Sequence, residues 1–282
     1  MKKLILGTAQ LNNKYGLFNS IKKDKIEIFR FLEFCTEHNI FDFDTAEGYR
    51  NHKLLGEFFN SNKFTYKPKI FTKISSISKL HKNDEERLLY FKKKVEKIIK
   101  ELSMVPNTIL FHDINDIKFF KKNFYILKKV LSDYGKINLG LSIYELKDIS
   151  NIKSLEKITL QVPLNCANLE FQNKFANNCK IIARSVFLQG LLINLSLKKP
   201  PKIIEKSYSK YVTYINNHQI DPIDLCMNFV EKQKIDRYIV GADNIQQLKK
   251  IISYKKQKLN HIHVKNVNSF FSKKTSDPRL WL

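Results

Sequence analysis

The sequence predicts an α/β fold, a single-domain (β/α)8 TIM barrel that covers residues 1–282. Eight short apolar segments of strand length recur along the chain, and segments with helical spacing of apolar residues separate most of them. The apolar segments lack strict alternation, which suits parallel strands that are buried on both faces. A closed barrel needs this arrangement, because each connection must cover the outer face of the sheet. No linker, low-complexity segment or change of composition divides the chain.

Each predicted strand is a short run rich in Ile, Leu, Val and Phe. The eight runs are residues 3–10, 41–46, 69–74, 108–111, 137–144, 157–164, 180–187 and 237–242. An open, doubly wound sheet is the structural alternative, and it would normally carry a GxGxxG motif after its first strand. Here the first strand leads into LGTAQLNNKYG, in which the glycines are Gly7 and Gly16. The sequence therefore favours the closed barrel.

The predicted helices carry apolar residues near helical spacing. The first covers residues 24–38, where Asp24 can cap its start. The stretch 200–236 is longer than one crossover needs and is predicted to hold two helices, the second with Pro222 near its first turn. The other predicted helices are residues 52–59, 84–102, a helix through 119–130, and 244–254.

The composition limits the class of partner. The chain has 50 Lys+Arg against 27 Asp+Glu, a net charge of +23. Its cations are mostly dispersed lysines without interleaved aromatics, so nucleic-acid binding is not expected, and an acidic or phosphorylated substrate is easier to infer. No run approaches the ~18 apolar residues of a membrane span. The four scattered cysteines indicate neither a metal site nor disulfides, so no metal and a cytoplasmic location are predicted.

Polar residues end or follow three neighbouring predicted strands. They are Asp44, Tyr49, Lys73 and His112. The carboxyl ends of barrel strands meet at one mouth, where a cationic Lys73 is expected to lower the pKa of Tyr49 from ~10. With Asp44 orienting Lys73 and His112 aligning a substrate oxygen, the set is a general acid facing a carbonyl. Such a site supplies no reductant, so a hydride donor is implied, and nicotinamide is the common one.

The chain resembles the aldo-keto reductases. The resemblance lies in stretches that follow the family's order over nearly the whole chain: LGTAQLNNKYG, FDFDTAEGYRNHKLLGEF, FTKIS, LFHD, GLSIYE, QVPLN, ARSVFLQGLL and IVGADNIQQLKKI. It implies an eight-stranded β/α barrel and NAD(P)H-dependent reduction of aldehydes and ketones. By this resemblance Tyr49 is the proton donor, Lys73 and Asp44 tune it, and His112 orients the carbonyl.

The resemblance also implies a nicotinamide cofactor, NADP(H) in preference to NAD(H). Ser142 and Gln161 match residues that hold the carboxamide. Arg184 stands where many members have an aromatic residue, and its planar guanidinium can stack on the nicotinamide instead. The remaining matches are Gly7, Thr8 and Asp44 near the nicotinamide and its ribose, Ser185, Phe187, Gln189 and Gly190 around the pyrophosphate, and Gly241, Asp243, Asn244 and Gln247 around the adenosine phosphate.

Several positions depart from the family pattern. Ile143 replaces an asparagine of the carboxamide grip, and Lys53 replaces a glutamate in the loop after Tyr49. Gly241 and Gln247 stand where members specialised for the 2′-phosphate often carry Lys or Arg. The tail DPRLW resembles a bacterial branch associated with surface-sugar biosynthesis, which implies a sugar-derived carbonyl.

Two other functions compete with a carbonyl reductase. A barrel lyase could use Lys73 as a Schiff-base nucleophile. A catalytically silent module could retain the barrel and bind the cofactor as a sensor. The predicted partner is in each case a small molecule, with no nucleic acid and no membrane, and the sequence leaves the oligomeric state open.

Overall fold

The computed structural model of the protein describes residues 3–12, 17, 23–79, 83–150, 157–174 and 179–281. Gly16, which belongs to the first resembling stretch, lies outside the described residues. Within the described residues, no helix is both long enough and apolar enough to cross a membrane.

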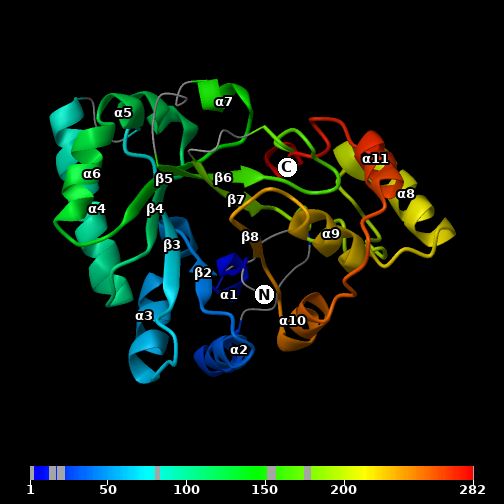
Figure 1. The fold of residues 1–282 in the computed structure, drawn as a ribbon, viewed down its shortest axis with the longest axis horizontal. Coiled ribbons are helices and arrows are strands. Elements are labelled where there is room, and N and C mark those ends of the chain that lie inside the picture. The colour runs from blue at the N-terminus through cyan, green and yellow to red at the C-terminus, as the bar shows by residue number, and fades with distance from the viewer. Residues whose placement is uncertain are drawn as a thin grey trace.

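Eight parallel strands close into a barrel in the order of the sequence (Figure 1). The barrel closes where β1 pairs with β8, with Leu4 opposite Tyr238. The predicted α/β barrel is therefore confirmed. The strands are β1 Leu4–Gly7, β2 Asp42–Asp44, β3 Lys69–Ile74, β4 Thr108–Phe111, β5 Asn138–Ser142, β6 Ile158–Pro163, β7 Cys179–Arg184 and β8 Arg237–Val240.

The helices lie outside the strands, and α8 packs beside α11 (Figure 1). Their bounds are α1 Ala9–Asn12, α2 Lys25–Glu37, α3 His52–Ser61, α4 Asp84–Leu102, α5 Ile117–Lys122, α6 Phe124–Ser132, α7 Lys147–Ser150, α8 Lys202–Asn217, α9 Pro222–Glu231, α10 Ile245–Ile252 and α11 His261–Phe270. Short 3-10 helices are η1 Glu47–Tyr49, η2 Ile114–Asp116 and η3 Pro278–Leu280.

Local sequence explains where the main helices begin. Asp24 and Glu27 form a reciprocal capping box at α2, each side chain accepting from the other residue's backbone N–H. Asp221 caps α9 and Pro222 occupies its first turn, where a missing N–H costs nothing. These signals are local in the chain, so the sequence predicts these helix starts well.

Close packing fixes the barrel and its outer layer. A Cβ added to Gly140 in β5 would lie 2.0 Å from the Thr159 carbonyl oxygen of β6. A Cβ added to Gly56 would lie 2.3 Å from the Glu101 carbonyl oxygen, because α3 and α4 approach closely there. Four strands also contribute a separate small apolar cluster of Ile5, Phe71, Ile182 and Ile239. These contacts place the strand ends at fixed positions.

The structure differs from the predicted elements at several ends. The first strand was expected to run through Gln10, but β1 ends at Gly7 and the chain turns into α1. The predicted helix through 119–130 is divided at Asn123, whose Nδ2 donates to the Phe119 carbonyl. Helices α7 and α11 were not predicted, because their short segments carry few core residues.

Candidate active site

The four side chains predicted to carry the chemistry come together at one end of the barrel. Asp44 ends β2, Lys73 lies late in β3, and His112 directly follows β4. Tyr49 lies in η1, which follows β2 after a short turn. All four line the same cavity of about 810 Å³. Parallel strands of matched register produce this meeting, since their carboxyl ends share one edge.

Two of these four side chains, Lys73 and Asp44, form a buried ion pair. The Lys73 Nζ lies 2.6 Å from Asp44 Oδ1 and also donates to the Thr45 carbonyl oxygen at 3.0 Å. The second carboxylate oxygen of Asp44 accepts from Gln161 Nε2 at 2.8 Å. Both charges are therefore compensated and held in one orientation, which a buried pair requires.

Tyr49 lies above the ion pair, with the Lys73 Nζ 5.3 Å from the centre of its ring. Burial raises the pKa of the phenol above its usual value, the Asp44 carboxylate raises it further, and the Arg184 cation acts in the opposite direction. The sequence-based expectation was a pKa lowered by Lys73. The structure differs because the phenol is buried, which is the main cause of the raised pKa, and because the Asp44 carboxylate beside Lys73 raises it further. Tyr49 therefore keeps its proton at neutral pH and can donate it.

His112 is half-buried beside the same group. Burial lowers the pKa of its imidazole to about 4, and the cations Lys73 and Arg184 add to the effect. The ring is therefore neutral at pH 7 and retains one N–H donor. A neutral imidazole can donate a hydrogen bond to a carbonyl oxygen without competing with Tyr49 for protonation.

The low pKa of His112 predicts a pH dependence. The folded pKa of about 4 lies below the ordinary 6.5, so the unfolded chain takes up a proton first as the pH falls. The stability that this group gives is complete above pH 6.5 and is lost as the pH falls towards 4. We expect an NMR titration of His112 to give a midpoint near 4, and His112→Gln to weaken the fall in unfolding free energy between pH 7 and 5. A midpoint near 6.5 would contradict this.

The large cavity extends from these groups across the ends of β6, β7 and β8 to the start of α10. Besides the four catalytic candidates, eleven of the predicted cofactor residues line it: Gly7, Gln161, Arg184, Ser185, Phe187, Gln189, Gly190, Gly241, Asp243, Asn244 and Gln247. Thr8 and Ser142 are not among the residues that line it. Thr8 is fully buried, and its hydroxyl donates to the Asp44 carbonyl oxygen at 2.9 Å.

Two buried polar atoms, on the cavity-lining Gln161 and on its register partner Ser142, test whether a nicotinamide fits. Ser142 and Gln161 are register partners on β5 and β6. The Ser142 Oγ and the Gln161 Oε1 are buried and make no hydrogen bond within the described part of the chain. A hydroxyl donor beside an amide acceptor suits a ligand amide, which accepts through its oxygen and donates through its nitrogen. The residues present therefore fit a nicotinamide carboxamide.

The loop after β7 has an unusual backbone. Ser185, Leu188 and Gln189 have φ values of 56°, 47° and 54°, and Gly190 follows with 86°. Left-handed residues other than glycine are costly and collect at functional sites. Successive backbone N–H groups in such turns form concavities that bind anions. This loop therefore suits the pyrophosphate that the family resemblance implies for it.

The residues predicted around the adenosine phosphate lie where β8 leads into α10. Asn244 caps α10 by accepting from the Gln247 backbone at 2.8 Å. The Gln247 side chain accepts from the Asp243 backbone at 2.5 Å. Burial raises the pKa of Asp243, and Lys23 opposes this. Lys250 also lines this end of the cavity and was not predicted.

Two further residues near the catalytic groups, Tyr144 and Arg279, were not predicted from the sequence. Tyr144 lines the cavity, and the guanidinium carbons of Arg184 and Arg279 lie 4.3 and 3.7 Å from the centre of its ring. The predicted stacking of Arg184 on a nicotinamide stays a prediction. The sequence offers one signal for these two residues, because Tyr144 and Arg279 lie in GLSIYE and DPRLW, two of the stretches on which the resemblance rests. For metals, the described residues contain no group of three or more His, Cys, Asp or Glu that could hold an ion.

Comparison with known proteins gives consistent relatives. Residues 3–271 match the model of the aldo/keto reductase family. A comparison with curated proteins found no match. Among solved structures, the glycerol dehydrogenase of Gluconobacter oxydans is similar at 17% identity and a TM-score of 0.70, covering 98% of this chain and 93% of that one.

Two further structures share the fold. An aldo-keto reductase of Bombyx mori in complex with NADP has 14% identity and a TM-score of 0.68, covering 100% of this chain and 93% of its own. An aldo-keto reductase from a Medee basin deep-sea metagenome library has 16% identity and a TM-score of 0.65, with 98% and 92% covered. At these identities the likeness establishes the barrel.

Proposed function

Because this chain belongs to the aldo-keto reductase family, we propose that it reduces an aldehyde or ketone to an alcohol with NAD(P)H, using Tyr49 as the general acid. Family membership makes the protein an oxidoreductase of carbonyl compounds. The observation that carries the proposal is the meeting of Tyr49, His112 and the Lys73–Asp44 pair in one cavity, next to an unsatisfied Ser142–Gln161 pair that fits an amide.

The side chains divide the proton chemistry between them. The neutral His112 donates a hydrogen bond that orients the carbonyl oxygen, and Tyr49 gives its proton to that oxygen as negative charge develops. Arg184 is the cation that favours the phenolate that remains, and the Lys73–Asp44 pair lies beside the Tyr49 ring. A bound nicotinamide supplies the hydride.

We propose NADP(H) in preference to NAD(H). The similar Bombyx mori enzyme was solved with NADP. Lys250 places a cation at the α10 end of the cavity, and Lys23 is close enough to Asp243 to affect its pKa. Because Lys23 also interacts with Glu27, Lys250 is the cation that favours the additional phosphate at this end of the cavity.

The lyase alternative has less support. A Schiff-base lysine must be free and deprotonated to attack a carbonyl. Here the Lys73 Nζ donates to both Asp44 and the Thr45 carbonyl, so the nitrogen is engaged in hydrogen bonds instead of being free to attack. A silent sensor would bind the cofactor but turn over no carbonyl.

Cofactor titration with a Ser142→Ala variant tests the proposal. We expect NADPH to quench the fluorescence of the lone tryptophan, Trp281, at lower concentration than NADH. Ser142→Ala is expected to raise the Kd about 2- to 10-fold, because one hydrogen bond to the amide is lost. Its Tm should stay unchanged, because the Ser142 hydroxyl has no partner within the described residues.

The accompanying assay is NADPH consumption with a panel of aldehydes and ketones. Binding without turnover of any carbonyl would favour the sensor. Absence of binding by either nucleotide, or a Ser142→Ala variant that binds like the parent, would contradict the assignment of the cavity.

A further inference from the structure

A second, smaller cavity of about 220 Å³ adjoins the catalytic groups. Tyr49 and His112 line it as well as the large cavity, so a substrate carbonyl bound between them also faces this space. Three cationic side chains stand in its wall, namely Arg184, Lys273 and Arg279. Three carboxylates, Glu145, Glu170 and Asp277, line the pocket as well, so which of the cations lack an ion-pair partner decides where positive charge stays open.

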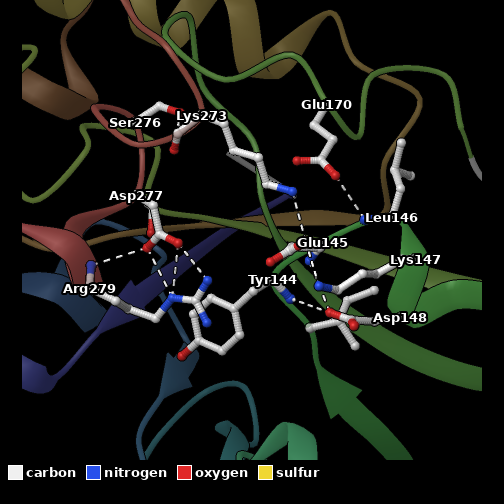
Figure 2. Close-up of polar contacts among 12 residues, drawn as sticks. Tyr144, Glu145, Leu146, Lys147, Asp148, Glu170, Lys273, Ser276, Asp277 and Arg279 are labelled. Carbon is white, nitrogen blue, oxygen red and sulfur yellow. Dashed lines mark hydrogen bonds and ion pairs between the residues drawn. The ribbon is translucent and has the colours of Figure 1, made fainter.

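The C-terminal tail forms one side of this pocket (Figure 2). Lys273 reaches the loop after β5 and pairs with Glu145 at 2.7 Å. The Arg279 guanidinium lies over the Tyr144 ring at 3.7 Å. The β5 loop is itself fixed, since the backbone N–H of Glu145 donates to Asp148 at 3.0 Å. Residues from distant parts of the chain thus make a wall of defined shape.

Ion pairs neutralise two of the three cations. Lys273 is paired with Glu145, and Arg279 with Asp277 through Nε at 2.9 Å and Nη2 at 2.5 Å. These two cations therefore brace the tail against the β5 loop.

Arg184 differs from the other two cations. It has no carboxylate within ion-pair distance among the described residues, although it is near enough to Asp277 to help lower the pKa of that carboxyl. Its Nη1 donates to the Ser185 hydroxyl at 3.3 Å and its Nη2 to the Ile143 carbonyl at 3.2 Å. A guanidinium has five N–H donors, so part of its capacity stays open. The half-buried position excludes much of the water that would otherwise screen its charge.

The charge of Arg184 acts directly on the catalytic groups. Burial is the main cause of the pKa shifts of Tyr49 and His112, and Arg184 contributes to both pKa values as a nearby cation. The Tyr144 ring, 4.3 Å away, fixes the plane of the guanidinium. Tyr144 is therefore a positioning residue for Arg184.

We propose that the substrate carries an anionic group, a carboxylate or a phosphate, a few bonds from its carbonyl carbon, and that Arg184 binds it. The inference rests on the proposed function, because it places the carbonyl at Tyr49 and His112. An oxyanion in the small cavity would form an ion pair with Arg184. A planar guanidinium binds carboxylate and phosphate in a bidentate manner. A neutral substrate of the same shape would leave Arg184 with only the more distant charge of Asp277.

Matched substrate pairs test this assignment. The assays use saturating NADPH, so that an effect of Arg184 on cofactor binding does not change the measured ratio of kcat/KM values. The pairs are succinic semialdehyde against butanal, and glycolaldehyde phosphate against glycolaldehyde. We expect kcat/KM to favour the charged member of at least one pair by about 10-fold or more, the effect of a charge-assisted hydrogen bond. The pair that responds identifies the anion as carboxylate or phosphate.

Variants link the preference to Arg184. Arg184→Gln is expected to lower the charged-to-neutral ratio about 10-fold or more, and Arg184→Lys to keep an intermediate ratio because the charge remains. Lys122→Gln, which removes a surface cation paired with Asp84, is the control and should keep the parent ratio. Should Arg184→Gln fail to fold, the parent ratio and Arg184→Lys still decide the question.

The outcomes separate the two proposals. Turnover of butanal and glycolaldehyde with no preference for either charged partner would overturn the anion site and leave the reductase standing. An unchanged ratio in Arg184→Gln would equally remove Arg184 from the assignment. No NADPH consumption with any carbonyl would contradict the reductase itself.

Discussion

Tyr49→Phe is expected to lower kcat for carbonyl reduction about 10²- to 10⁴-fold, the usual contribution of a positioned general acid. The phenol is the group that can deliver a proton at neutral pH, because burial raises its pKa while His112 is already neutral. Phenylalanine keeps the ring and removes only the hydroxyl. Steady-state kinetics with saturating NADPH would measure the loss.

The control is the equivalent change on the surface. Tyr125 is 74% exposed on α6, and Tyr125→Phe should keep the parent kcat. The Kd of NADPH for Tyr49→Phe should stay within about threefold of the parent, since the predicted role of the hydroxyl is in proton transfer. A Tyr49→Phe variant that retained full kcat would remove Tyr49 as the acid.

Lys73→Met is expected to lower the free energy of unfolding by about 3–5 kcal/mol, because it leaves the Asp44 carboxylate buried without its partner. The side chains of Lys73 and Asp44 are only 2% and 5% exposed, so water cannot replace the lost contact. Urea unfolding monitored by circular dichroism would measure the change.

A double-mutant cycle distinguishes this cause from general damage to the barrel. Adding Asp44→Asn removes the unpaired charge while keeping an oxygen that can accept from Gln161 Nε2. We expect the double variant to recover much of the lost stability and to remain catalytically impaired. A loss below about 1 kcal/mol in Lys73→Met would show that the pair is not the stabilising contact described above.

The fold was largely predictable because its signals are local. Eight apolar runs, a reciprocal cap at Asp24 and Glu27, and Pro222 at a helix start each depend on residues a few positions apart. The errors lie where tertiary contact decides. The chain turns into α1 after Gly7, and Asn123, whose side-chain amide also donates to Asp84 on α4, divides one expected helix into α5 and α6.

The candidate site divides in the same way. Asp44, Lys73 and His112 could be placed together from the sequence, because parallel topology brings consecutive strand ends to one edge. The pKa of Tyr49 could not be predicted, because it depends on burial and on which group neutralises Lys73. The sequence shows which residues carry charge, but it gives neither the burial of a side chain nor its ion-pair partner.

The sequence by itself determined the barrel, its order of strands and the residues at the mouth, since each follows from short-range pattern and a topology with one consistent solution. Only the tertiary structure decided which charges remain unpaired. It brought the tail residue Arg279, which is paired with Asp277, onto Tyr144, and left Arg184 without a carboxylate within ion-pair distance among the described residues. Electrostatic interactions depend on distance and burial in space, which the linear order of residues does not contain.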